Sequence, residues 1–205
     1  PLISRVVGED FCVKASDCPR VNIVDGYYSE NKCRIRLCME PCYTLTSSVA
    51  KIAKENTPIS GDTYSCSEMK DGKYALVLSD GMGVGPRAAM ESSAAISMLE
   101  HLIEAGFDYE FAVRTVNSVL LVRSPDETFA TIDLAVIDPF KAQIEFTKIG
   151  SAPSFIKRGR DVQIIRSRTL PAGILSSIDI EKSCRTIREG DLIIMLTDGV
   201  IDSRK

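Results

Sequence analysis

Hydrophobic and polar positions along the chain predict more strands than helices. Continuous apolar runs over residues 73–79 and 129–137, each bounded by turn residues, are typical of buried strands. Apolar residues recur every three or four positions over residues 86–105 and 109–122, which predicts two consecutive helices. Further strands are expected at residues 142–149, 154–157, 162–165 and 191–197. Because the helices do not alternate with strands, the pattern favours an α+β fold with helices packed on antiparallel sheets.

The first 42 residues differ from the rest of the chain in composition. They are rich in cysteine and charge, and an alternating stretch at residues 34–38 suggests a strand. The sequence begins without Met and stops just after an apolar run, so we interpret it as a piece of a longer protein. We expect residues 1–42 to be the end of an adjoining regulatory region and residues 43–205 to be a separate core that lacks its final portion.

Seven cysteines require an explanation. Their odd number disfavours a disulfide scaffold, and the absence of a Cys-x-x-Cys spacing disfavours a zinc knuckle. Reduced thiols, several of them buried, are the expected state. A metal or redox cluster within residues 12–42 is the alternative. The cysteines are Cys12, Cys18, Cys33, Cys38, Cys42, Cys66 and Cys184.

Composition excludes several classes of function. The 25 Lys and Arg residues against 28 Asp and Glu residues give a net charge of −3, which argues against binding of nucleic acid or an anionic membrane through net charge. The longest apolar runs have five residues, far fewer than the ~20 that a membrane-spanning helix needs. A globular domain with a sizeable core is therefore expected.

One short element occurs twice and ends each time in Asp-Gly. The first copy is residues 74–81, YALVLSDG, and the second is residues 192–199, LIIMLTDG. Each copy predicts a buried strand that delivers a carboxylate, Asp80 or Asp198, to the edge of a sheet. The glycine permits a sharp turn there and lets the backbone approach a ligand. A third aspartate, Asp62, also follows a glycine.

Three converging carboxylates would repel one another and raise one another's pKa unless a cation lies between them. Mg²⁺ and Mn²⁺ prefer such oxygen ligands, and a pair of these ions can activate a water molecule. The simpler interpretation is that Asp-Gly closes a hairpin in both copies. A dinucleotide-binding loop at residues 81–85, GMGVG, is disfavoured because the third glycine of that motif is wrongly spaced.

Several stretches in this order resemble the metal-dependent serine/threonine phosphatases of the PPM or PP2C type, and among them the sporulation branch. The stretches are ISGDTYS, LSDGMGVGPRAAMES, TFATIDLAVID, GSAPSFIKRG, LPAGI and GDLIIMLTDGVID. They cover roughly residues 43–203. The resemblance implies an αββα sandwich with two Mn²⁺ or Mg²⁺ ions at one end.

The resemblance also implies roles for single residues. Asp62, Asp80 and the carbonyl of Gly81 would be metal ligands. Asp80 would bridge the two ions and would be the catalytic residue. Asp198 would bind one of the two ions. Arg87 is a candidate for contact with the substrate phosphate, although an exposed arginine at a helix start is usually only solvated.

The sequence departs from the family in two respects. The family has one more aspartate on a strand beyond residue 205, so the core is expected to be C-terminally truncated and short of one ligand. Ser151 stands where related stress-response phosphatases have a histidine, and the only histidine, His101, is expected on the solvated side of a helix. Water activated by the metals is therefore the expected proton donor to the leaving serine.

The resemblance implies a sporulation regulator that dephosphorylates a phosphorylated anti-anti-sigma protein and so promotes release of a sigma factor. The chain would be a cytoplasmic domain of a protein that reaches the membrane only through parts absent here, and a homodimer is left open. The alternative is a catalytically incompetent fragment or a regulatory binding module without metal-dependent activity.

Thr131 and Asp133 are two further candidates that the pattern does not place. They lie on one face of their expected strand, opposite Ile132 and Leu134. This face either approaches the metal site or faces solvent.

Overall fold

The computed structural model describes residues 2–8, 11–17, 34–52, 59–81, 85–123 and 129–203. The chain divides into two compact units, Pro1–Thr44 and Leu45–Lys205. The first unit contains α1 (Leu2–Val7) and the antiparallel strands β1 (Phe11–Asp17) and β2 (Arg34–Met39). The strand expected at residues 34–38 is thus confirmed, whereas the regulatory role of this region stays a prediction.

A five-stranded antiparallel sheet is the centre of the second unit. Its strand order is β3-β4-β5-β6-β9, so β3 and β9 are its edges. Both edge strands have polar residues at most positions, and the apolar pattern predicted neither of them as a strand. The bounds are β3 (Asp62–Glu68), β4 (Tyr74–Asp80), β5 (Ile132–Asp138), β6 (Gln143–Ile149) and β9 (Glu181–Thr186).

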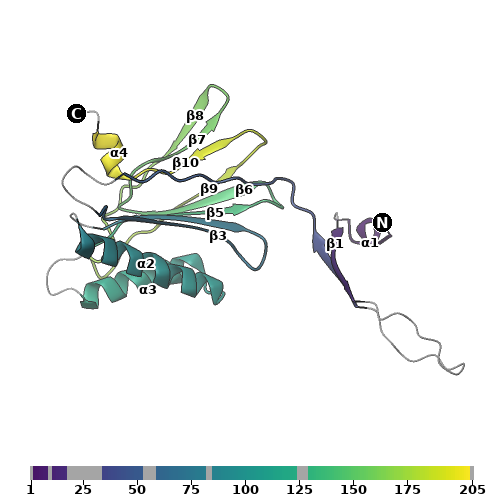
Figure 1. Cartoon of the computed structure of the whole chain (residues 1–205), viewed down its shortest axis with the longest axis horizontal. Helices are drawn as coiled ribbons and strands as arrows, with labels where there is room; N and C mark the ends of the chain where they lie inside the picture. The colour runs from purple at the N-terminus through teal and green to yellow at the C-terminus, as the bar shows by residue number, and fades with distance from the viewer. Residues whose placement is uncertain are drawn as a thin grey trace, which may run out of the picture. The chain divides into compact units, whose positions relative to one another are not determined.

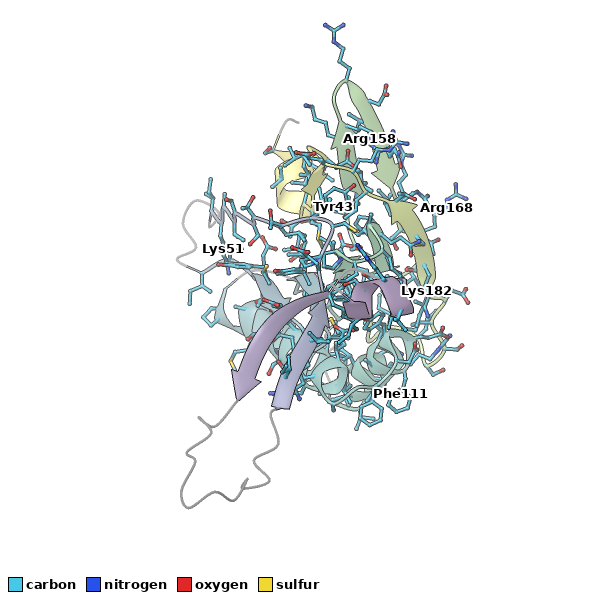
Figure 2. All side chains as sticks on the ribbon, turned by 90° about the vertical axis from the view of Figure 1, so that its right-hand side faces the viewer. Tyr43, Lys51, Phe111, Arg158, Arg168 and Lys182 are labelled. Carbon is cyan, nitrogen blue, oxygen red and sulfur yellow. The ribbon has the colours of Figure 1, made fainter. Side chains whose placement is uncertain are left out.

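A three-stranded sheet lies against one face of this central sheet, and two helices cover the other face (Figure 1). The smaller sheet has the order β10-β7-β8, with β10 at one edge. Figure 2 shows Phe111 among the helices and Arg158 near the smaller sheet, on opposite sides of the unit. The bounds are α2 (Pro86–Glu104), α3 (Tyr109–Arg123), β7 (Ser154–Arg158), β8 (Asp161–Ile165), β10 (Leu192–Ile194) and α4 (Asp198–Asp202).

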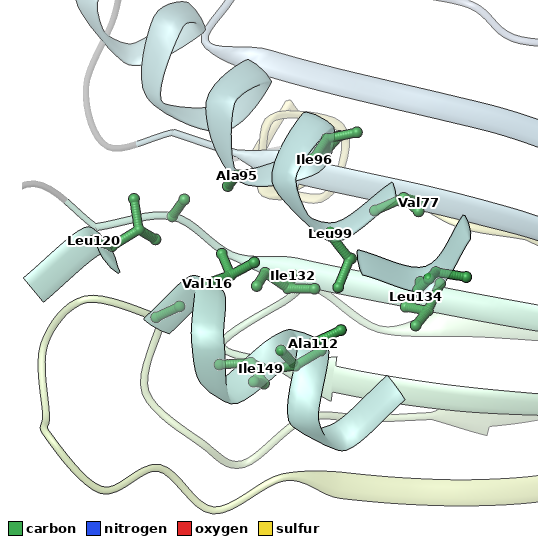
Figure 3. Close-up of a cluster of buried hydrophobic side chains, with 14 of the residues drawn as sticks. Val77, Ala95, Ile96, Leu99, Ala112, Val116, Leu120, Ile132, Leu134 and Ile149 are labelled. Atoms are coloured by element: carbon green, nitrogen blue, oxygen red, sulfur yellow. The ribbon is translucent and has the colours of Figure 1, made fainter. Parts of the chain in front are cut away.

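Two hydrophobic cores separate the three layers. The first core lies between the helices and the central sheet, where Leu99 of α2 and Val116 of α3 pack with Leu134 of β5 (Figure 3). The second core lies between the two sheets and includes Phe146 and Ile156. The expected α+β fold is confirmed. Of the two helical layers in the expected αββα sandwich, the described residues form one.

The second Asp-Gly copy is less buried than the pattern predicts. Only Leu192–Ile194 form a strand, and Leu192 is 54% exposed. The reason is that β10 is an edge strand, paired on one side by β7 alone. The prediction of a second fully buried strand was therefore wrong.

The expectation of buried thiols was also wrong wherever the structure describes the side chain, because Cys42, Cys66 and Cys184 are all exposed. The side chains of the other four cysteines lie outside the described residues. Within the ranges that the structure describes, no helix is both long enough and apolar enough to cross a membrane.

Candidate functional site

Strand pairing brings the first two predicted ligands together. Asp62 begins β3, Asp80 ends β4, and the two residues are direct partners in the antiparallel register. Directly opposed residues on neighbouring strands project their side chains to the same face of the sheet, about 5 Å apart. The stretch ISGDTYS alone does not show that Asp62 pairs with Asp80 on a neighbouring strand.

The third predicted ligand arrives from the far end of the chain. The hydroxyl of Thr197 donates a hydrogen bond to Oδ2 of Asp62 at 3.2 Å, across 135 residues of sequence. The next residue, Asp198, begins α4, and its carboxyl group lies close enough to that of Asp80 to raise the pKa of Asp80. The three aspartates therefore meet at one end of the sandwich, where α4 and the start of α2 lie in Figure 1.

Asp80 has the most perturbed environment of the three. Burial, then the adjacent carboxyl of Asp198 and then that of Asp62, together raise the pKa of Asp80 to about 8. A carboxyl group surrounded in this way keeps a proton near neutral pH unless a cation replaces it. The structure thus has the electrostatic signature that the sequence pattern predicted for converging carboxylates.

The donor set consists of oxygen atoms, which is the chemistry that Mg²⁺ and Mn²⁺ prefer. Within the described part of the chain, however, no group of three His, Cys, Asp or Glu side chains is arranged to hold a metal ion as it stands. The carboxyl groups of Asp198 and Asp62 lie near that of Asp80 and raise its pKa. The residues fit a divalent cation in the chemistry of their donor atoms.

Gly81 follows Asp80 in a position that admits no side chain. A Cβ atom there would lie 2.1 Å from the carbonyl oxygen of Ala88 in α2. The N–H of Gly81 donates to the carbonyl of Gly61 at 3.4 Å, and the chain continues to α2. Residues 82–84 lie outside the described residues. The alternative in which this Asp-Gly closes a hairpin is therefore wrong.

Hydrogen bonds fix the backbone on both sides of Asp80. Its N–H donates to Oγ1 of Thr131 at 2.9 Å, and its carbonyl accepts from the N–H of Thr131 at the same distance. The buried hydroxyl of Ser92 in α2 donates to the carbonyl of Gly61 at 2.6 Å. Thr131 therefore lies at the site. The sequence pattern alone did not decide whether this residue approaches the site or faces solvent.

The structure also decides between the two alternatives for Asp133, which were proximity to the site and exposure to solvent. It is 1% exposed, so the solvent-facing alternative is wrong. Its Oδ2 lies 2.5 Å from Nζ of Lys148 on the neighbouring strand and accepts a hydrogen bond from Ser154. Sequence reasoning missed Lys148 and Ser154. The one available signal was a lysine on the same face of its strand as the apolar Ile144 and Phe146.

Arg87 and His101 both lie on exposed parts of α2. The Arg87 side chain is 67% exposed and pairs with Glu91, four residues on, at 3.5 Å. Contact between Arg87 and a substrate phosphate stays a prediction. His101 is exposed, as the helical pattern predicted.

A solved structure shares both the fold and much of the sequence. It contains the PP2C phosphatase domain and a fragment of the regulatory domain of the cell fate determinant SpoIIE from Bacillus subtilis, and it matches with a TM-score of 0.81 and 36% identity. The match covers 100% of this chain and 57% of that chain. The fold is that of PP2C-type phosphatase domains. The family model for stage II sporulation protein E matches residues 70–205, and the chain belongs to this family.

Curated relatives agree with this assignment. Stage II sporulation protein E of Priestia megaterium is 38% identical over 205 residues, all of this chain and 34% of the relative's length. Phosphoserine phosphatase RsbU of Bacillus subtilis is 24% identical over 148 residues, which is 71% of this chain and 44% of RsbU. The chain thus spans about a third of the sporulation protein that it resembles.

Proposed function

We propose that this domain hydrolyses phosphoserine on a protein substrate with the help of divalent metal ions. The single observation that carries the proposal is the meeting of Asp62, Asp80 and Asp198 at one end of the sandwich. Membership of the stage II sporulation protein E family and similarity to a phosphoserine phosphatase support the same reaction.

Asp62, Asp80, the carbonyl of Gly81 and Asp198 are the groups that would hold the ions, with Asp80 shared between two of them. Phosphatases of this class depend on divalent metals, and Mn²⁺ or Mg²⁺ suits these oxygen donors. When bound, the ions supply Lewis-acid activation of water and of the phosphoryl group. The chain contributes the fixed positions of its carboxylates, because β3 and β4 are locked in register.

The proton for the departing serine does not come from a histidine in this proposal. The only histidine of the sequence, His101, lies on an exposed part of α2, and Ser151 lines the small cavity beside Asp80. The hydroxyl of Ser151 is too weak an acid to replace an imidazolium. Water at the site is therefore the proposed proton source.

The proposed substrate is a phosphorylated anti-anti-sigma protein, whose dephosphorylation promotes release of a sigma factor. Support comes from the family to which the chain belongs. As part of the same proposal, the domain works in the cytoplasm within a longer, membrane-associated protein.

The test is a titration of the intact chain with Mn²⁺ and Mg²⁺ against a phosphoserine protein substrate, with phosphate release as the readout. We expect metal-stimulated turnover that Asp80→Asn lowers by at least about a thousandfold, since several charge-stabilising contacts depend on this one residue. Asp161→Asn is the matched control, because Asp161 is an exposed aspartate on β8. Equal activity of wild type and Asp80→Asn contradicts the proposal. Absence of any metal effect favours the alternative, a binding module without catalysis.

A further inference from the structure

A buried charged cluster at the seam between the two sheets has no role in the mechanism so far. Asp133 on β5 and Lys148 on β6 are direct partners in the central sheet, and Ser154 begins β7 in the smaller sheet. All three residues are at most 1% exposed. The cluster therefore connects the two sheets at the end of the sandwich that holds Asp80.

Both described side-chain contacts of Asp133 use the same oxygen atom. Nζ of Lys148 lies 2.5 Å from Oδ2, the hydroxyl of Ser154 donates to Oδ2 at 2.5 Å, and Lys148 also donates to Ser154 at 2.9 Å. Burial alone raises the pKa of Asp133 and lowers that of Lys148, and each residue opposes the shift of the other. The paired arrangement compensates the charge of Asp133.

The second oxygen of Asp133 has no partner although it is buried. Oδ1 of Asp133 and Oγ of Ser151 are both without a hydrogen bond among the described residues. An unsatisfied buried acceptor destabilises the fold, and more so if it is charged. Two such atoms on residues that line one cavity point to a partner that can serve both.

Both residues line the same small cavity. Its volume is about 40 Å³, and its lining includes Asp133, Ser151, Asp80 and Asp198. An ordered water needs at least about 10–15 Å³ and two to four polar partners. The cavity meets both requirements. A further cation is disfavoured next to Asp133, because the ammonium group of Lys148 already neutralises this carboxylate.

We propose that this cavity holds an ordered water molecule that accepts a hydrogen bond from Ser151 and donates to Oδ1 of Asp133 and to the carboxyl group of Asp80. Asp133 is thereby a positioning residue, which Lys148 and Ser154 hold in place and which acts on Asp80 through the water. The link to Asp80 rests on the proposed function, whereas the water site itself does not. Partners behind a metal ligand typically change metal affinity about 10–100-fold when they are removed.

The first test is a high-resolution crystal structure of the intact chain in the absence of metal. We expect water density within about 3 Å of both Oδ1 of Asp133 and Oγ of Ser151. An empty cavity, or a direct hydrogen bond between Ser151 and Asp133, overturns the water site. This result does not depend on activity.

The second test compares Mn²⁺ affinity by titration calorimetry with thermal stability. We expect Ser151→Ala, which leaves the ion pair intact, to weaken Mn²⁺ binding about tenfold. Asp133→Asn should weaken it at least as much. Thr147→Val is the matched control, because Thr147 is buried on the same strand as Lys148 but projects from the opposite face. Its Mn²⁺ affinity should equal that of the wild type.

The outcomes separate the two proposals. If the wild type binds Mn²⁺ and both Ser151→Ala and Asp133→Asn bind it equally well, the positioning role of Asp133 is wrong while the phosphatase proposal stands. If the wild type binds no metal and hydrolyses no phosphoserine, the proposed function fails, and the crystal structure still decides whether the water is present. A loss of Mn²⁺ affinity in Ser151→Ala at unchanged melting temperature supports the positioning role, because a merely structural role would lower both.

Discussion

The two Asp-Gly elements reach the same site from unlike surroundings. In the first, β4 lies inside the central sheet between β3 and β5, and its residues alternate between buried and half-buried. In the second, β10 is a three-residue edge strand of the smaller sheet, and Leu192 at its start is half exposed. Two local sequences that share an apolar run, a hydroxyl residue and Asp-Gly therefore deliver one carboxyl group from an interior strand and the other from an edge.

The comparison teaches that the local pattern sets the direction of the carboxylate, while neighbouring elements set how rigidly it is held. The backbone N–H and carbonyl of Asp80 are both held by hydrogen bonds to Thr131. Asp198 begins a five-residue helix without a buried residue, and Thr197, its N-cap, makes no side-chain cap bond. We expect the first element to tolerate change poorly and the second to tolerate it well.

Alanine in place of the two glycines should give the largest difference. In Gly81→Ala the new Cβ would lie 2.1 Å from the carbonyl oxygen of Ala88, so α2 has to shift, and we expect a loss of about 3 kcal/mol in the free energy of unfolding. At Gly199 nothing lies within 4 Å of an added Cβ. Because Gly199 is helical, Gly199→Ala should be neutral or stabilising by up to about 1 kcal/mol. Urea denaturation of both variants measures the difference, and equal losses contradict it.

Removal of apolar side chains should give the next largest difference. Val77 on β4 is 3% exposed and packs in the core beneath the helices. Val77→Ala should lower the free energy of unfolding by about 2 kcal/mol, through lost burial and the cavity that remains. Leu192→Ala removes a larger side chain but one that is half exposed, so a change within about 0.5 kcal/mol is expected. The comparison fails if Leu192→Ala is the more destabilising variant in thermal and chemical denaturation.

Much of the fold could be predicted because the sequence patterns of its central elements agree with their surroundings. The strands β4 and β5 are largely apolar because they are covered on both faces, and α2 and α3 show a helical period because one side packs on the sheet. The polar strand β3 was missed because its stability comes from pairing with β4, which no local pattern records. The polar edge strand β9 was missed for the same reason.

Only those residues of the candidate site that neighbouring residues in the sequence mark could be predicted. Asp80 and Asp198 stand out because apolar runs precede them, and the geometry then brings them together with Asp62. Lys148 and Ser154 could not be assigned to the site, since the contact between them depends on two sheets packing face to face. The sequence pattern placed Asp133 on one face of its strand but did not identify its partner. That partner, Lys148, is determined by the register between β5 and β6.

Replacement of the two carboxyl groups by amides should give the smallest difference, in the pH dependence of metal-free stability. In the unfolded chain Asp80 has a pKa near 3.8, and in the folded protein burial and the neighbouring Asp198 and Asp62 raise it to about 8. Between these values the folded state holds a proton that the unfolded state has released, so stability falls as the pH rises and levels off above about pH 8.

Asp80→Asn removes this pH dependence. Its free energy of unfolding should exceed that of the wild type by about 1 kcal/mol near pH 9, a modest figure because Asp80 is partly solvated. Asp198→Asn removes only one of the two acidic neighbours and should reduce the slope without abolishing it. Chemical denaturation with a chelator present, from about pH 4 to about pH 9, measures both slopes. If the slope is the same in the wild type and in Asp80→Asn, the convergence of carboxyl groups on Asp80 does not determine the stability of this end of the sandwich.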